Sequence, residues 1–158
     1  MLKFKTLAVI AVIGALAGCM KNESPQPCTP KTVESEMAAM NKFATDSSIT
    51  VTNDASGLMY QVIEPGTGFT PGPQSMVKVN YHGRLLNGVE FDRNYTGNFS
   101  FKLNEVIVAW QIALQKIKPG GKMKIITPSA LAYSCNPYVP PALNNQPLYF
   151  YIELLHAQ

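Results

Sequence analysis

The sequence has few of the residues that bind metals, nucleotides or nucleic acids. It contains two histidines, His82 and His156, which lie far apart, and three cysteines. Neither a P-loop nor a G-x-G-x-x-G run occurs. Charged residues make up only 15% of the chain, and the formal net charge of +3 includes Lys3 and Lys5. We therefore expect no metal, no cofactor and no nucleic-acid partner.

A long transmembrane run is also missing from the N-terminal region. Lys3 and Lys5 precede an apolar stretch over residues 7–16, whereas a membrane-spanning helix needs about 20 apolar residues. A short apolar stretch behind positive charges is typical of a cleaved export signal, so we predict a signal peptide over residues 1–18. The run 16–19 (LAGC) resembles a bacterial lipobox, in which the cysteine is acylated and becomes the new N-terminus.

This resemblance implies a lipoprotein attached to a membrane of a bacterial cell envelope through lipid on Cys19, facing the periplasm or the outer surface. An ordinary secretory peptide with an incidental cysteine is the alternative. Residues 19–31 contain three prolines among polar residues, which indicates an extended tether. The other two thiols, Cys28 and Cys135, are free to pair in an exported protein, but two unpaired thiols fit the sequence equally well.

The rest of the chain predicts one α+β domain over residues 56–158, preceded by a helix and connecting segment over 32–55. Thr32 is a candidate N-cap, and apolar residues at helical spacing follow it over about three turns. One short helix offers little surface for dimerisation, so we expect it to pack on its own domain and the protein to be a monomer.

Alternating apolar residues predict strands around residues 58–63, 77–81, 99–103, 123–127 and 148–154. Asn87-Gly88 predicts a hairpin whose returning arm carries Val89 and Phe91. Between Asn104 and Lys118 the apolar residues fall on one helical face, which predicts the one long helix of the domain.

The run 77–92 (VKVNYHGRLLNGVEFD) resembles the signature V-x-V-x-Y-x-G-x-L-x-x-G-x-x-F-D of FKBP-type peptidyl-prolyl cis-trans isomerases. Further motifs of that family follow in order at residues 99–101, 105–110, 118–122, 132–133, 139–141 and 150–155. The resemblance implies a bent antiparallel sheet wrapped around one central helix, with a short helix in front. It also implies an enzyme that isomerises Xaa-Pro bonds of unfolded or flexible polypeptides and so assists the folding of exported proteins.

The family resemblance also implies a set of site residues. Asp92 and Tyr133 are the expected catalytic pair, with Trp110 as the floor beneath the proline ring and the Ile107 N–H as a second donor. The remaining substrate-binding positions are Tyr81, Phe91, Phe99, Val106, Val139 and Phe150.

Departures from the family pattern cluster around the expected pocket. Ala109 and Ser134 stand where the family has glycine, the segments 93–98 and 133–140 are short, and 142–147 is long. These changes leave an alternative open, a non-catalytic chaperone or binding module that keeps the fold.

Overall fold

The computed structural model describes residues 27–158, which form a six-stranded antiparallel sheet and two α-helices. The predicted signal peptide and Cys19 lie outside this part of the chain. The strand order is β1-β2-β5-β6-β3-β4, and each neighbouring pair is antiparallel. The strands are β1 (Thr52–Asn53), β2 (Met59–Glu64), β3 (Met76–Leu85), β4 (Glu90–Lys102), β5 (Lys122–Thr127) and β6 (Leu148–Ala157).

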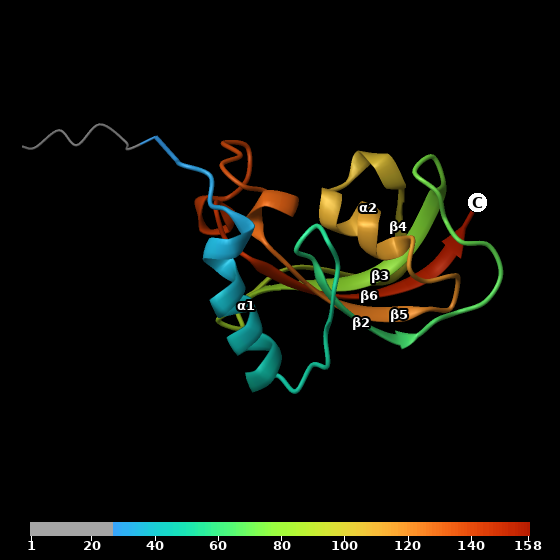
Figure 1. Ribbon diagram of the computed structural model, residues 1–158. Coiled ribbons are helices and arrows are strands. Elements are labelled where there is room, and N and C mark those ends of the chain that lie inside the picture. The colour runs from blue at the N-terminus through green and yellow to red at the C-terminus, as the bar shows by residue number, and fades with distance from the viewer. Residues whose placement is uncertain (1–26) are drawn as a thin grey trace, which may run out of the picture.

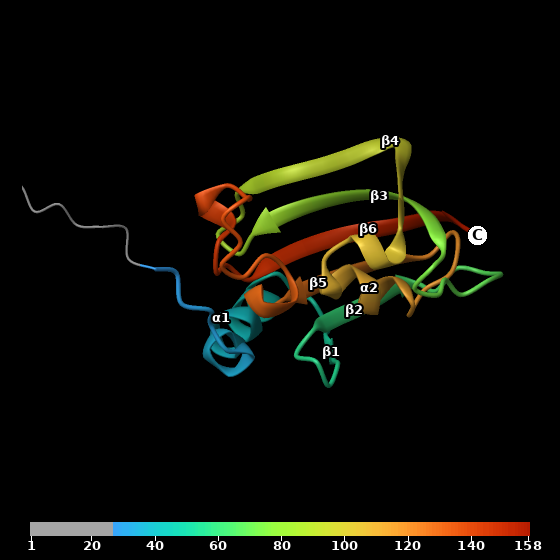
Figure 2. The ribbon, with the colours of Figure 1, turned by 90° about the horizontal axis from the view of Figure 1, so that it is seen from above.

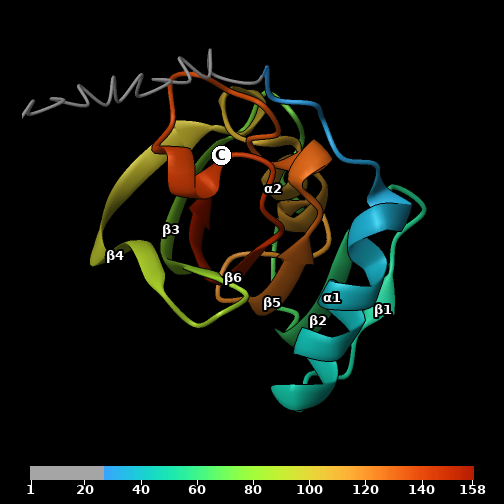
Figure 3. The ribbon, with the colours of Figure 1, turned by 90° about the vertical axis from the view of Figure 1, so that its left-hand side faces the viewer.

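The sheet curves around one helix and carries the other on its outer face. Helix α2 (Val108–Leu114) lies within the concave side, and helix α1 (Val33–Asp46) lies outside the curve (Figures 1 and 3). The predicted fold class is therefore confirmed. Three short 3-10 helices complete the described elements: η1 (Leu103–Glu105), η2 (Ser129–Leu131) and η3 (Pro141–Leu143).

Two hydrophobic clusters stabilise the fold, one on each face of the sheet. The larger cluster fills the space between the sheet and α2 and includes Trp110 and Phe150. The smaller one, here called the outer cluster, joins α1 to the outer face of the sheet. Its buried members are Met40, Ala44, Ile49, Met59, Ile126 and Tyr149. Because side chains alternate along a strand, neighbours such as Ile125 and Ile126 of β5 enter different clusters.

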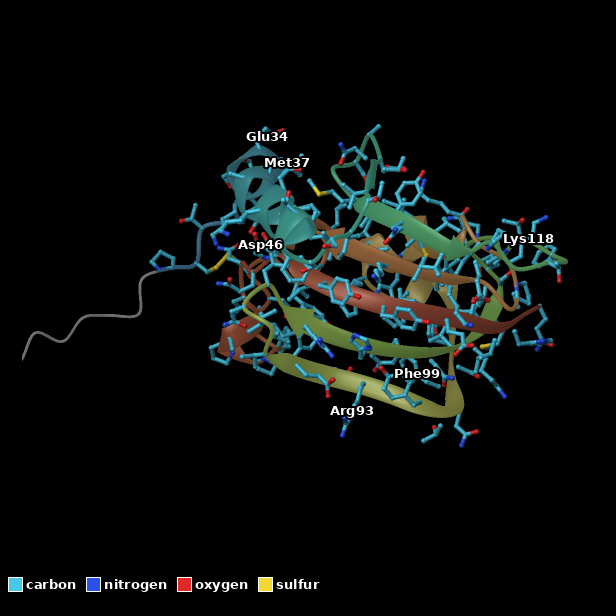
Figure 4. All side chains as sticks on the ribbon, turned by 90° about the horizontal axis from the view of Figure 1, so that it is seen from below. Glu34, Met37, Asp46, Arg93, Phe99 and Lys118 are labelled. Carbon is cyan, nitrogen blue, oxygen red and sulfur yellow. A yellow bond between two sulfur atoms is a disulfide. The ribbon has the colours of Figure 1, made fainter. Side chains whose placement is uncertain are left out.

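The sequence accounts well for α1. The Thr32 hydroxyl oxygen accepts the Ser35 N–H at 3.3 Å, which caps the first turn. Glu34 and Glu36 in that turn are stabilised by the positive end of the helix dipole. The helix packs on its own domain, as predicted. Figure 4 shows it over one end of the outer face, whereas Arg93 of the edge strand β4 points away from the sheet.

The β3–β4 hairpin is confirmed, but its second strand is longer than predicted. Gly88 has φ +91° in the tight turn, where the Leu85 N–H donates to the Val89 carbonyl at 2.9 Å. The predicted arm at Val89–Phe91 and the separate strand at 99–103 are one strand, β4. A register shift opposite β3, between the pairs Val79–Phe99 and Tyr81–Asn94, places the polar residues between them in a bulge.

The prediction of one long central helix over 104–118 is wrong. Helix α2 has 7 residues, and α1, with 14, is the longer helix. Val106 and Ile107 have extended backbone conformations, with ψ of 174° and 145°. Their apolar spacing matches a helical face, yet both side chains pack against the core cluster from an extended segment.

The described end of the predicted tether is fastened to the domain. Cys28 and Cys135 form a disulfide with their Cα atoms 5.6 Å apart. Beside it, the Asn145 amide donates to the Thr29 carbonyl at 2.6 Å, and the Lys31 ammonium donates to the Asn145 carbonyl at 2.8 Å. Over residues 27–158, no helix has the length and apolar character needed to cross a bilayer.

Candidate functional site

A cavity of about 250 Å³ opens on the concave side of the sheet. The side chains that line it come from β3, β4, β6, α2, the segment that precedes α2 and the loop that follows η2. The lining residues are Tyr81, Asp92, Phe99, Glu105, Val106, Ile107, Trp110, Tyr133 and Phe150. Eight of the ten pocket residues expected from the sequence are therefore brought together in one place.

Aromatic rings form the base of this cavity. Trp110 is only 4% exposed and packs edge-on against Tyr81 and Phe150, with ring centroids 5.0 and 5.4 Å apart. Phe99 lies 5.4 Å from Tyr81 and continues the wall along β4. The rings support one another in fixed orientations, so the cavity has a rigid apolar floor suited to a small apolar ring.

Asp92 is the carboxylate of the cavity, and a neighbouring tyrosine fixes its orientation. The Tyr81 hydroxyl donates a hydrogen bond to Asp92 Oδ2 at 2.7 Å. Burial, followed by this bond to Asp92, raises the pKa of Tyr81. Tyr81 therefore stays protonated at neutral pH and keeps donating to the carboxylate. Among residues 27–158, this is the one hydrogen bond that the Asp92 carboxylate accepts.

Hydrogen-bond donors around the cavity lack partners among residues 27–158. Trp110 Nε1 is buried without one, the Ile107 N–H makes no backbone hydrogen bond, and no bond to the Tyr133 hydroxyl is formed. Burial, and secondly the charge of Asp92, raises the pKa of Tyr133, so this hydroxyl keeps its proton at neutral pH. Such an apolar cavity with free donors suits a ligand that combines an apolar ring with carbonyl groups.

Comparison with known proteins assigns the chain to a family. The family model described as FKBP-type peptidyl-prolyl cis-trans isomerase matches residues 68–155, which is more than half of the chain. The chain belongs to this family. The match begins well after α1 and includes every residue that lines the cavity.

Individual relatives agree with the family assignment. The chain is 42% identical over 121 residues to the FKBP-type peptidyl-prolyl cis-trans isomerase FkpA of Escherichia coli, covering 74% of this chain and 43% of that protein. It is 35% identical over 105 residues to Outer membrane protein MIP of Legionella longbeachae, covering 65% and 45%. The chain thus spans less than half the length of these two relatives.

A solved structure that the FKBP-type chain resembles is the crystal structure of a peptidyl-prolyl cis-trans isomerase from Pseudomonas syringae pv. tomato. The TM-score is 0.65 at 32% sequence identity, and the match covers 82% of this chain and 98% of that one. Almost the whole of that structure therefore has a counterpart here.

Two expected pocket residues of the FKBP-type domain lie outside the cavity lining. Phe91 packs edge-on against the lining residue Phe150, with ring centroids 5.6 Å apart. Gly83 permits this contact, because a Cβ there would lie 2.7 Å from the Phe91 ring and 2.8 Å from the Phe150 ring. Val139 is half-buried against the core cluster. Their roles in substrate binding remain predictions.

The sequence interpretation missed one lining residue, Glu105. It closes η1 and directly precedes Val106 and Ile107, so its position beside two expected pocket residues was the available signal. Its carboxylate makes the lining acidic, since Asp92 and Glu105 are its two charged residues. Within residues 27–158, no group of three or more His, Cys, Asp or Glu side chains could hold a metal ion.

Ser134 keeps a backbone conformation that glycine adopts more easily. Its φ is +44°, in the left-handed region, and its position is one where the family resemblance implies glycine. Its N–H donates to the Ser129 carbonyl at 2.9 Å, and its own carbonyl accepts the Asn145 N–H at 2.8 Å. The departure from the family pattern therefore leaves the local turn in place, with a non-glycine residue held in it by two hydrogen bonds.

Proposed function

We propose that this protein is a peptidyl-prolyl cis-trans isomerase that acts on unfolded or flexible polypeptides and assists the folding of exported proteins. The observation that supports it best is the aromatic cavity floored by Trp110, which has Asp92 and the Tyr133 hydroxyl at its polar side. Membership of the FKBP-type family supports the same activity.

The chemistry requires no covalent step. Rotation about an Xaa-Pro bond meets a barrier of about 18–20 kcal/mol because amide resonance makes the bond partly double. Resonance separates charge between oxygen and nitrogen, and water stabilises that charge better than an apolar cavity does. Transfer of the bond into the cavity raises the planar ground state relative to the twisted amide, which has lost resonance. Twisting then becomes easier.

The polar groups of the site favour the twisted geometry. The Tyr133 hydroxyl and the Ile107 N–H donate to substrate carbonyls, and Asp92, oriented by Tyr81, faces the twisting amide. Donors placed for the twisted conformer bind it more tightly than either planar isomer. Phe91 and Val139 contribute through their contacts with Phe150 and with the core cluster.

A cis-to-trans relaxation assay on a short Xaa-Pro peptide tests this function. The wild-type protein should accelerate isomerisation, and Tyr133→Phe should lower kcat/KM by about 2- to 10-fold, the value of one hydrogen bond. Asp92→Asn, which retains an acceptor for Tyr81, should lower it by about tenfold through loss of charge. Tyr151→Phe is the matched control, because Tyr151 packs with the outer cluster and should leave the rate unchanged.

The rate should be flat between about pH 6 and 8, since the raised pKa of Tyr133 keeps its hydroxyl protonated throughout this range. Burial lowers the pKa of His82, but this residue stacks on Tyr151 of the outer face. A folded wild-type protein that gives no acceleration, yet suppresses aggregation of an unfolded client, would support the chaperone alternative instead.

We further propose that the mature protein is a monomer anchored to a cell-envelope membrane through lipid on Cys19. The lipobox-like run 16–19 supports the anchor, and the Cys28–Cys135 disulfide supports an exported protein, because disulfides persist in oxidising compartments. Outer membrane protein MIP is a relative whose name places it in a membrane.

Mass spectrometry of membrane-extracted protein should find an acylated chain that starts at Cys19. Cys19→Ser should abolish acylation and release the protein from the membrane fraction, since the anchor is the lipid. Cys28→Ser is the matched control and should leave membrane partitioning unchanged. A mature chain that begins elsewhere would rule the anchor out.

A further inference from the structure

A buried carboxylate connects α1 to the loop that carries Tyr133. Glu36 is only 3% exposed, and its Oε2 accepts two hydrogen bonds from Ser129, from the N–H at 2.7 Å and from the hydroxyl at 2.9 Å. A buried charge is unfavourable unless it is strongly hydrogen-bonded. Glu36 also lies outside residues 68–155, the part of the chain that the family model matches.

Ser129 is in turn hydrogen-bonded to both sequence neighbours of Tyr133. Its carbonyl accepts the Ala132 N–H at 3.0 Å and the Ser134 N–H at 2.9 Å. Ser129 is itself fully buried. The path from Glu36 to the backbone on either side of Tyr133 therefore consists of one residue and its hydrogen bonds.

The other carboxylate oxygen of Glu36, Oε1, makes burial of this side chain costly. Oε1 is buried without a hydrogen-bond partner among residues 27–158, and the Lys31 ammonium lies 3.9 Å away. Burial of a carboxylate at this position therefore costs free energy, and an apolar side chain would avoid that cost. The benefit that offsets this cost is the pair of hydrogen bonds that the carboxylate accepts from Ser129.

The Tyr133 loop needs such support because it has little regular structure. Between β5 and β6 the chain forms only the three-residue helices η2 and η3, and Ser134 and Asn145 have left-handed backbone conformations. Figures 1 and 2 show this loop at the same end of the sheet as α1. The Cys28–Cys135 disulfide fastens the loop a second time, two residues after Tyr133.

We propose that Glu36 is a positioning residue for Tyr133, so that α1 forms part of the isomerase site. The inference rests on the proposed isomerase function. Loss of the carboxylate leaves the Ser129 N–H unpaired in a buried position, so the turn that holds Ala132 and Ser134 loosens and the Tyr133 hydroxyl is no longer fixed at the cavity.

Kinetics of the purified full-length protein test this role. Glu36→Ala should lower kcat/KM by about as much as Tyr133→Phe, up to roughly tenfold. Glu36→Gln should restore part of that loss, since its amide oxygen still accepts from Ser129. In the Tyr133→Phe background, Glu36→Ala should have little further effect, because the hydroxyl that it positions is already absent. A merely structural role would give independent, additive losses.

Met40→Ala is the matched control on the same helix. Met40 is fully buried in the outer cluster, so its truncation weakens the packing of α1 but leaves the Glu36–Ser129 bonds. Its folded fraction should isomerise at the wild-type rate. All variants are compared at a temperature where circular dichroism shows them folded.

Hydrogen exchange at the Ala132 and Ser134 amides gives a readout that does not depend on catalysis. Both amides should exchange faster in Glu36→Ala than in wild type or Met40→Ala. Unchanged exchange, unchanged kcat/KM in a folded Glu36→Ala protein, or additive losses with Tyr133→Phe would each overturn the proposal. If wild type itself shows no isomerase activity, the proposed function fails, and the exchange result alone decides whether Glu36 positions the loop.

Discussion

Replacement of Trp110 by alanine should lower the free energy of unfolding by about 3–5 kcal/mol and remove most of the isomerase activity. Trp110 is 4% exposed and contacts Tyr81, Phe101 and Phe150 through its ring. Its truncation leaves a large cavity in the larger hydrophobic cluster, between the sheet and α2, and removes the floor on which the proline ring would lie. This one substitution therefore removes core packing contacts and the floor of the substrate cavity together.

Trp110→Phe separates these two effects. It keeps an aromatic ring and removes a buried N–H that has no partner among the described residues, so we expect a net loss of only about 1–2 kcal/mol. Urea unfolding followed by far-ultraviolet circular dichroism measures both variants, because Trp110 is the only tryptophan and its fluorescence is lost. A folded Trp110→Ala protein with wild-type activity would contradict the proposed floor.

Removal of the Cys28–Cys135 disulfide should lower the free energy of unfolding by about 2–5 kcal/mol. The two cysteines are 107 residues apart, so the bridge closes a loop that includes most of the described chain. Such a long loop strongly restricts the unfolded chain. The double variant Cys28→Ser/Cys135→Ser is the best test, because it leaves no lone reactive thiol in the domain.

Denaturation with and without reductant supplies the control for the disulfide. Reductant should destabilise wild type by the same amount as the double substitution and should leave the double variant unchanged. Thiol labelling of the denatured, unreduced protein gives an independent answer, since two reactive thiols at these positions would show that the bridge does not form.

Much of the fold follows from the sequence because its signals are local. Strand alternation placed β2, β3, β5 and β6, Asn87-Gly88 placed the hairpin, and Thr32 placed the start of α1. β4 was divided in two because the bulge between Asn94 and Phe99 interrupts the apolar pattern with polar residues. The central helix was predicted too long because an extended segment that lines a cavity shares its apolar spacing with a helix.

The site could be predicted where the family motif is continuous and not where contacts join distant segments. Tyr81, Asp92 and Trp110 lie in motif runs, and the structure brings them to one cavity. The cysteine pairing stayed open because spacing alone gives no distance between residues 107 apart. The contact of Glu36 with Ser129 depends on how α1 crosses the sheet, which no local pattern encodes.

The position of β6 in the sheet bears on when the domain can fold. β6 is the final strand of the described chain, yet it pairs with β5 on one side and with β3 on the other. Without it, the sheet separates into β1-β2-β5 and β3-β4, and the two parts share no strand pairing. A chain that emerges from a ribosome or a translocation channel with its N-terminus first therefore cannot complete its sheet until residues 148–157 arrive. Until β6 is available the complete sheet cannot form, so it presents no folded obstacle to passage through a narrow pore.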